Sequence, residues 1–77
     1  MLSFVAPILV KGNCAEVELK SCTKVFTARI VVDAWVLAFN FFTSEGFLVP
    51  FSGELDACKD TVYAALYSAS KQGRLRS

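Results

Sequence analysis

Cysteine is the residue type in this chain that can take part in the widest range of chemistry, and it occurs three times, as Cys14, Cys22 and Cys58. The chain contains no histidine, so a cysteine nucleophile would lack its usual base. Structural zinc takes four Cys or His ligands at close spacings, which three cysteines without a CxxC pair do not supply. An odd number of cysteines also fits a disulfide framework poorly. We therefore expect free thiols in a reducing compartment, with no metal and no cofactor bound.

A Ser–Lys pair and a group of carboxylates are the other arrangements that resemble catalytic machinery. Ser21 and Lys24 have the S-x-x-K spacing of Ser–Lys hydrolases, but that spacing normally begins a helix, and here it falls in a predicted β loop without the other motifs of those enzymes. Glu54, Asp56 and Asp60 occur in the first turns of a predicted helix, where the helix dipole accounts for them. No reaction is specified, and we predict that the protein is not an enzyme.

A short basic segment near the C-terminal end, with Lys71, Arg74 and Arg76, is the candidate nucleic-acid-binding site. Neutralising about three phosphates gives weak binding with a shallow salt dependence. The formal net charge of +1 adds no basic field around these residues. An accessory or regulatory protein that binds nucleic acid is therefore an alternative and not the favoured function.

Alternating apolar and polar residues predict β-strands over the first fifty residues. Ala15, Val17 and Leu19 alternate with charged residues, which is the period of a half-buried strand. Pro7 and Pro50 fall in the first and last predicted strands, as expected at sheet edges, because proline cannot donate to a ladder. The predicted strands are 3–10, 15–20, 24–32, 34–42 and 47–51.

The stretch 34–42 is ambiguous, because it is apolar on both faces as a strand and nearly all round as a helix. Its aromatic and β-branched content favours a strand, with Trp35, Leu37, Phe39 and Phe41 on one face. A helix over the same stretch is the alternative, and such a helix would have to be fully buried.

Residues 53–72 have the pattern of an amphipathic helix. Ser52 precedes the pattern as an N-cap, acidic residues occupy the first turn, and Gly73 follows as a helix-ending residue. The predicted fold is therefore α+β: a single compact domain, 1–77, with an antiparallel β-meander of four to five strands, one C-terminal helix packed on one face and a short basic tail, 73–77. The apolar stripe of the helix consists of Leu55, Cys58, Val62, Ala65, Leu66 and Ala69.

Large apolar side chains exceed what one helix can cover. Between Ile30 and Gly53 the chain carries only two charges, and a helix covers one face of an antiparallel sheet. Monomers rarely expose apolar patches beyond several hundred Å², so either the sheet curls to bury both faces or a partner covers the rest. We expect the uncovered area on the sheet face opposite the helix, and Trp35 under the helix. The candidate partner-binding residues are Val36, Phe42, Phe47, Tyr63 and Tyr67.

These observations favour a protein that works by contact. We expect a non-enzymatic protein-interaction module, similar in size and character to a phage- or virus-encoded inhibitor of a host protein complex, such as the anti-CRISPR type. Its partner would be another protein or a second copy of itself, and a homodimeric structural protein is a further alternative. The longest uncharged run, 34–44, has 11 residues, against about 20 for a membrane span. We therefore expect no membrane association and a cytoplasmic location, in the host if the protein is viral.

Overall fold

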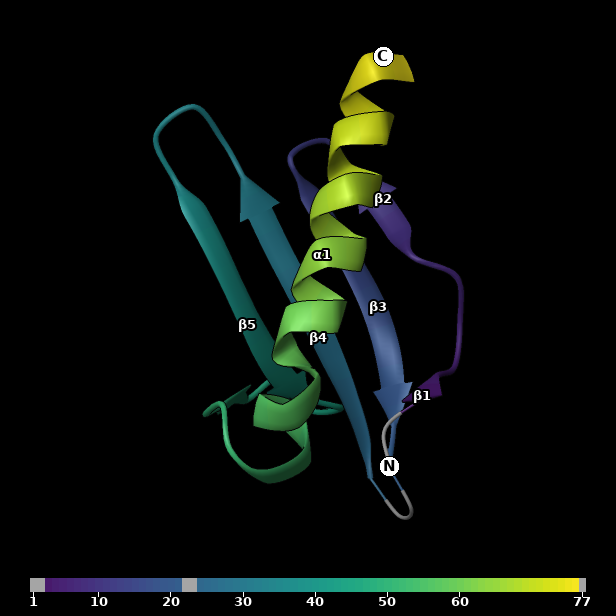
Figure 1. Ribbon diagram of the computed structural model, residues 1–77, viewed down its shortest axis with the longest axis vertical. Coiled ribbons are helices and arrows are strands. Elements are labelled where there is room, and N and C mark those ends of the chain that lie inside the picture. The colour runs from purple at the N-terminus through teal and green to yellow at the C-terminus, as the bar shows by residue number, and fades with distance from the viewer. Residues whose placement is uncertain (1–2, 22–23, 77) are drawn as a thin grey trace.

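The computed structural model describes residues 3–21 and 24–76, and for 73–76 it describes the backbone alone. Its elements are β1 (Ser3–Phe4), β2 (Leu9–Lys11), β3 (Cys14–Lys20), β4 (Val25–Val32), β5 (Leu37–Thr43), β6 (Leu48–Val49) and α1 (Gly53–Arg76). The strands form one antiparallel sheet in the order β1-β3-β4-β5-β6, with β2 also paired to β3, and α1 crosses one face of it (Figure 1). The predicted class, an α+β fold with an antiparallel sheet and a C-terminal helix, is confirmed.

The N-terminal edge of the sheet is divided between two short strands. β1 and β2 both pair with β3, and Pro7 lies between them. The prediction of one continuous strand over 3–10 is therefore wrong, because proline has no N–H to give to the ladder. The predicted position of Pro7 at a sheet edge is confirmed, because it lies between two short strands that pair with β3 at that edge.

β3 and β4 form the centre of the sheet and alternate as their sequences predict. Val17 is buried on the helix side, opposite the buried Ala28 of β4. The charged residues between these positions face away from the helix, where Arg29 Nε lies 3.4 Å from Glu16 Oε1. Both side chains of this ion pair are partly exposed, so the pair adds little to stability.

The ambiguous stretch is a strand, as its composition favours, but a shorter one than 34–42. β5 pairs with β4 along the whole length of β5. Residues 34–36 instead belong to the β4–β5 turn, in which the Asp33 N–H donates to the Val36 carbonyl at 2.8 Å.

Trp35 is the clearest departure from the sequence analysis. The alternation predicts it on the face of Phe39 and Phe41, under the helix, and this prediction is wrong: Trp35 lies in the turn and is 91% exposed. The Asp33 carboxylate accepts a hydrogen bond from the Ala34 N–H at 2.7 Å, the local bonding that makes aspartate common in turns. The alternation therefore stops where this turn begins.

β6 keeps only two residues of the predicted strand 47–51. Gly46, with a φ of +93°, donates its N–H to the Thr43 carbonyl at 2.9 Å and forms a tight turn after β5. Pro50 follows β6 directly and cannot donate to a ladder. The last strand is therefore too short to cover the length of β5.

α1 begins where the sequence predicts and ends later. The Ser52 carbonyl accepts bonds from the Leu55 and Asp56 N–H groups at 3.2 and 3.4 Å. The prediction that residues 73–76 form a tail after the helix is wrong, because they are helical. Ser77 lies outside the described residues. A glycine inside a helix costs only about 1 kcal/mol, and the Arg and Leu residues that follow are good helix formers.

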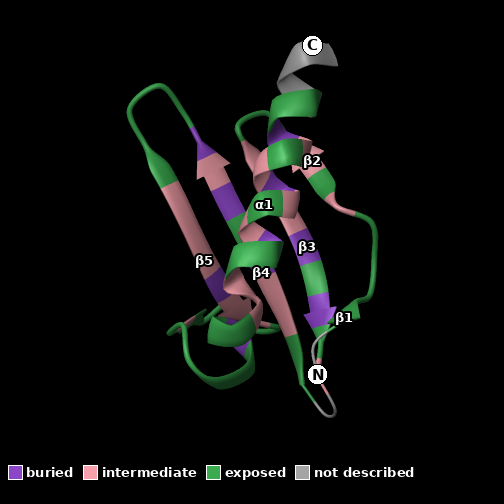
Figure 2. Cartoon of the chain, viewed as in Figure 1, coloured by how far each residue is buried: buried purple, intermediate pink, exposed green. Residues whose placement is uncertain are grey.

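The core lies between α1 and the strands β2, β3 and β4. Figure 2 shows buried segments along α1, β3 and β4, and an exposed turn between β4 and β5. α1 thus covers the N-terminal side and centre of the sheet more fully than β5. The buried apolar residues are Ala15, Val17, Leu19, Ala28, Ile30, Val32, Phe41, Leu55, Val62 and Leu66.

Ser70 is a buried polar residue of α1. It is 0% exposed, and its hydroxyl has no hydrogen-bond partner among the described residues. Such a hydroxyl costs about 1–3 kcal/mol, and alanine is also the better helix former. We expect Ser70→Ala to raise the free energy of unfolding by about 1–2 kcal/mol, as measured by urea denaturation. Ser68→Ala, at an exposed position of α1, controls for helix propensity, and equal stabilisation by both changes would contradict this explanation.

Candidate interaction surface

β5 presents a free backbone edge beyond the end of β6. β6 pairs with β5 only at Phe41 and Phe42, and among the strands of the described chain none pairs with residues 37–40 on that side. An unpaired edge is a template for another strand, and proteins usually protect such edges with charges or proline. Residues 37–40 contain neither.

The alternation along β5 decides which backbone groups point outward. The Val36 carbonyl accepts a hydrogen bond within the β4–β5 turn, and the Thr43 N–H donates within the β5–β6 turn, both at 2.8 Å. Successive residues of an antiparallel strand bond to opposite sides. Counting from both turns therefore gives the same result: Leu37 and Phe39 direct their N–H and C=O groups away from β4.

An aromatic cluster lies beside this edge, between β5 and α1. The Phe39 ring lies 5.3 Å from Phe41, 5.7 Å from Phe51 and 5.4 Å from Tyr63, measured between ring centroids. Tyr63 in turn stacks on Tyr67 at 5.8 Å. Phe41 is buried, whereas the other four rings are half-buried or exposed. The cluster is therefore open to solvent on the β5 side.

Exposed apolar side chains extend this cluster towards the β4–β5 turn, which projects away from α1 in Figure 1. Trp35 is 91% exposed, Leu37 54% and Phe51 43%. We call the side chains of Trp35, Leu37, Phe39, Phe51 and Tyr63, together with the free backbone of 37–40, the β5 edge surface.

Two lysines of α1 lie at the margin of the aromatic cluster. Lys71 Nζ is 4.9 Å from the centroid of the Tyr67 ring, and Lys59 Nζ is 5.9 Å from that of Phe51. Lys59 Nζ also lies 3.0 Å from Asp56 Oδ1, and the hydrogen bond between them raises the pKa of Lys59. Lys59 is thus paired with a carboxylate, and the two ammonium groups lie where the aromatic cluster meets the helix side.

Three of the five predicted partner-binding residues lie at or next to the β5 edge surface. Tyr63 and Tyr67 are half-buried members of the aromatic cluster. Val36, which is 51% exposed, lies in the turn beside Trp35. The residues of this surface that the sequence analysis missed are Trp35, Leu37, Phe39 and Phe51.

The other two predicted residues lie elsewhere. Phe42 is half-buried on the sheet face opposite α1, where the Arg29 guanidinium carbon is 4.9 Å from its ring centroid. Phe47 is 70% exposed in the β5–β6 turn. On the face opposite α1, β5 presents Ala38, Asn40 and the arginine-covered Phe42, and Leu48 of β6, the cross-strand neighbour of Phe42, is 65% exposed. Exposed apolar side chains therefore lie on the face opposite the helix as well as at the β5 edge.

Of the candidate nucleic-acid-binding residues, Lys71 is exposed and lies over the Tyr67 ring. Arg74 and Arg76 belong to the last turn of α1, and their side chains lie outside the described part of the chain.

Cys14 and Cys58 are free thiols, and Cys22 lies outside the described residues. Burial raises the pKa of both thiols, and the nearby Glu16 carboxylate raises the pKa of Cys14 further. Less of the reactive thiolate is then present at neutral pH. In residues 3–21 and 24–72, no three Cys, Asp or Glu side chains come together in a way that would hold a metal ion.

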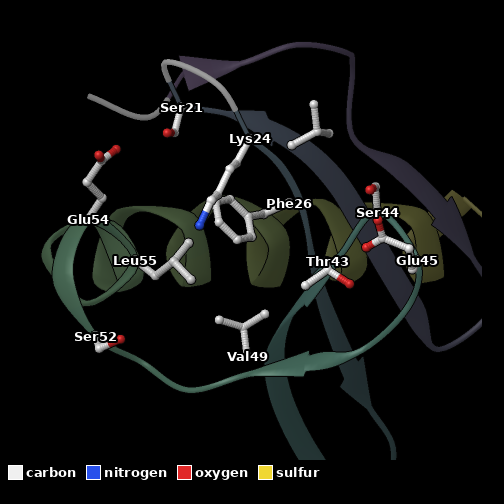
Figure 3. A pocket seen from close by; sticks show the side chains of 11 residues that line it. Ser21, Lys24, Phe26, Thr43, Ser44, Glu45, Val49, Ser52, Glu54 and Leu55 are labelled. Carbon is white, nitrogen blue, oxygen red and sulfur yellow. The ribbon is translucent and has the colours of Figure 1, made fainter.

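An open cleft of about 1040 Å³ lies between the β3–β4 connection, the β5–β6 turn and the start of α1 (Figure 3). Phe26, Val49 and Leu55 line its apolar part, and Lys24 extends across it beside the Phe26 ring. The Ser21 N–H donates to the Lys24 carbonyl at 2.9 Å. Ser21 and Lys24 therefore lie at the two ends of the connection between β3 and β4, as predicted, and do not begin a helix.

Comparisons with protein families, curated proteins and solved structures found no match to this chain. Within the stretches that the structure describes, no helix has the length and apolar character needed to cross a membrane.

Proposed function

We propose that this protein is a non-enzymatic interaction module that binds another protein chain through the β5 edge surface. The observation that carries the proposal is the free, uncharged strand edge with exposed apolar side chains beside it. Trp35, 91% exposed, leaves roughly 200 Å² of mostly apolar surface in water. Contiguous exposed apolar surface on a soluble protein commonly marks an interaction site.

The proposed mode of contact is strand addition. The outward backbone groups of Leu37 and Phe39 supply ladder hydrogen bonds, and pockets between side chains select the partner's residues. On the helix side, the added strand would meet the rings of Phe39, Phe51 and Tyr63. Because these rings are apolar over most of their area, large apolar residues at alternate positions of the partner strand fit them best.

Binding of this kind regulates a partner without catalysis. A phage- or virus-encoded inhibitor of a host protein complex acts in this way when it occupies a surface that the complex needs. Trp and Tyr are enriched among the residues that carry most of the binding energy in protein contacts, and the β5 edge surface contains one of each. Inhibition by occupation in the host cytoplasm is the action that we propose.

The double change Trp35→Ser and Leu37→Ser tests this proposal. Both side chains are more than half exposed, at 91% and 54%, so the melting temperature should stay within about 5 °C of the wild type. Capture of a partner from the native host, quantified by affinity purification and mass spectrometry, should fall at least tenfold. Leu9→Ser, at a 51% exposed position on the opposite sheet edge, should capture as the wild type does. Undiminished capture by the double variant would overturn the proposal.

A further inference from the structure

We infer that the strand added at the β5 edge is β5 of a second copy, so that two chains pair antiparallel about a twofold axis at Ala38. The inference rests on the proposed function, because the second copy uses the same β5 edge surface while no partner strand occupies it, and a partner strand would replace it there. Three features carry it: the outward backbone groups, the absence of charge on β5, and the place where β6 ends.

The free backbone of β5 is complementary to itself. Its outward groups belong to Leu37 and Phe39, one residue to either side of Ala38. With the axis at Ala38, Leu37 of each copy lies opposite Phe39 of the other. Opposed outward residues of an antiparallel pair exchange both N–H···O=C bonds, so every outward group of residues 37–40 is bonded.

The side chains of β5 also suit a symmetric pair. A twofold axis brings identical strands together, and like charges directly opposite each other destabilise a sheet. Leu37–Thr43 carries no charge, whereas β3 contains Glu16, Glu18 and Lys20, and β4 contains Arg29. Among the described strands of seven or more residues, β5 alone is uncharged and has large apolar residues at alternate positions.

The end of β6 leaves residues 37–40 open on their outer side. β6 reaches β5 at Phe41 and no further along the strand, so residues 37–40 are open to a second strand. An antiparallel pair about this axis places both α1 helices on the same side of the joined sheet, and each contact occurs twice. In this register Trp35 of each copy comes opposite Phe41 of the other, where Val49 of β6 already pairs, so pairing requires the β4–β5 turn of each copy to bend out of the joined sheet.

Disulfide trapping tests both the pair and its register. In a background with Cys14→Ser, Cys22→Ser and Cys58→Ser, the change Ala38→Cys places two thiols opposite each other at the axis. The two Cα atoms of such a non-hydrogen-bonded pair are about 4.5 Å apart, within the range of a disulfide. Mild oxidation should convert most of this variant to a covalent dimer on non-reducing electrophoresis. In Asn40→Cys, on the same face of the same strand, the thiols are about 14 Å apart, so that variant should remain monomeric.

Light scattering of the unmodified chain provides the second readout, with an expected mass of twice 8.4 kDa. A monomeric mass at every concentration, together with no trapping of Ala38→Cys, overturns the inference. Equal trapping of the Ala38→Cys and Asn40→Cys variants overturns it as well, because random collision would explain both. If the chain is monomeric and the Trp35→Ser, Leu37→Ser variant still loses partner capture, the occupant is a strand of another protein and the proposed function stands. If the chain is monomeric and the Trp35→Ser, Leu37→Ser variant captures partners as the wild type does, both the dimer and the proposed function are overturned.

Discussion

Phe41→Ala is expected to lower the free energy of unfolding by about 3–5 kcal/mol. Phe41 is 0% exposed and is paired on both sides, with Ala28 of β4 and Val49 of β6. Its ring lies 5.3 Å from that of Phe39 and 5.5 Å from that of Phe51. Truncation leaves a cavity in the core that the backbone of three hydrogen-bonded strands cannot move to close.

The effect is large for a chain of this size. A domain of 77 residues has a total stability of roughly 4–12 kcal/mol, so the Phe41→Ala variant should be close to unfolding at room temperature. Urea denaturation followed by circular dichroism measures the loss. Phe47→Ala removes the same atoms from a side chain that is 70% exposed, and its effect should stay within about 0.5 kcal/mol. Similar losses for the two variants would contradict the position of Phe41 in the core.

Leu37→Pro is expected to abolish self-association while the monomer stays folded. The Leu37 N–H points away from β4, so proline removes no ladder bond within the chain, and edge strands accept proline. In the paired state each proline removes one interchain donor and places its ring where the second strand must lie. We expect the association constant to fall at least 100-fold, or about 2.8 kcal/mol, as measured by sedimentation equilibrium.

Two further variants make this result specific. Leu37→Thr keeps the N–H and the β propensity, so it should associate more tightly than the proline variant. Ala38→Pro should instead destabilise the monomer by about 3 kcal/mol or more, because the Ala38 N–H is directed to β4. If Leu37→Pro destabilises the monomer as much as Ala38→Pro, the outward groups have been assigned to the wrong residues.

The parts of the fold that the sequence predicts are those in which local pattern and tertiary burial agree. Val17 and Leu19 alternate with charged residues, and both are buried in β3. Leu55, Val62 and Leu66 recur at helical spacing, and all three lie in the core. Each of these elements buries one face, and the apolar residues recur with the period of that face. The sequence alone therefore predicts both the element and its buried residues.

The errors occur where one local interaction decides the structure. The Asp33 carboxylate bonds to the Ala34 N–H and places Trp35 in a turn, although the alternation of apolar residues continues through it. The helix passes Gly73, because the cost of one glycine is smaller than the gain from the helix formers that follow. Neither the side-chain hydrogen bond in the turn nor the balance of helix propensities can be predicted from the spacing of apolar residues.

The candidate surface was only partly predictable for a related reason. The excess of large apolar side chains indicates that some must remain exposed, and Tyr63 and Val36 were identified from their types and positions. The free edge of β5 depends instead on where β6 stops, which the turn at Gly46 and the proline at position 50 determine together. A strand predicted over 47–51 would have covered part of that edge.

Residue-resolved amide hydrogen exchange, measured by NMR at low and high protein concentration, tests the central claim most directly. At low concentration the Leu37 and Phe39 amides should exchange at nearly unprotected rates, while the Ala38 and Asn40 amides, directed to β4, exchange slowly. On association the exchange of the Leu37 and Phe39 amides should slow by about 100-fold or more. If both amides keep exchanging rapidly under conditions where light scattering shows association, the contact lies elsewhere and the account is contradicted.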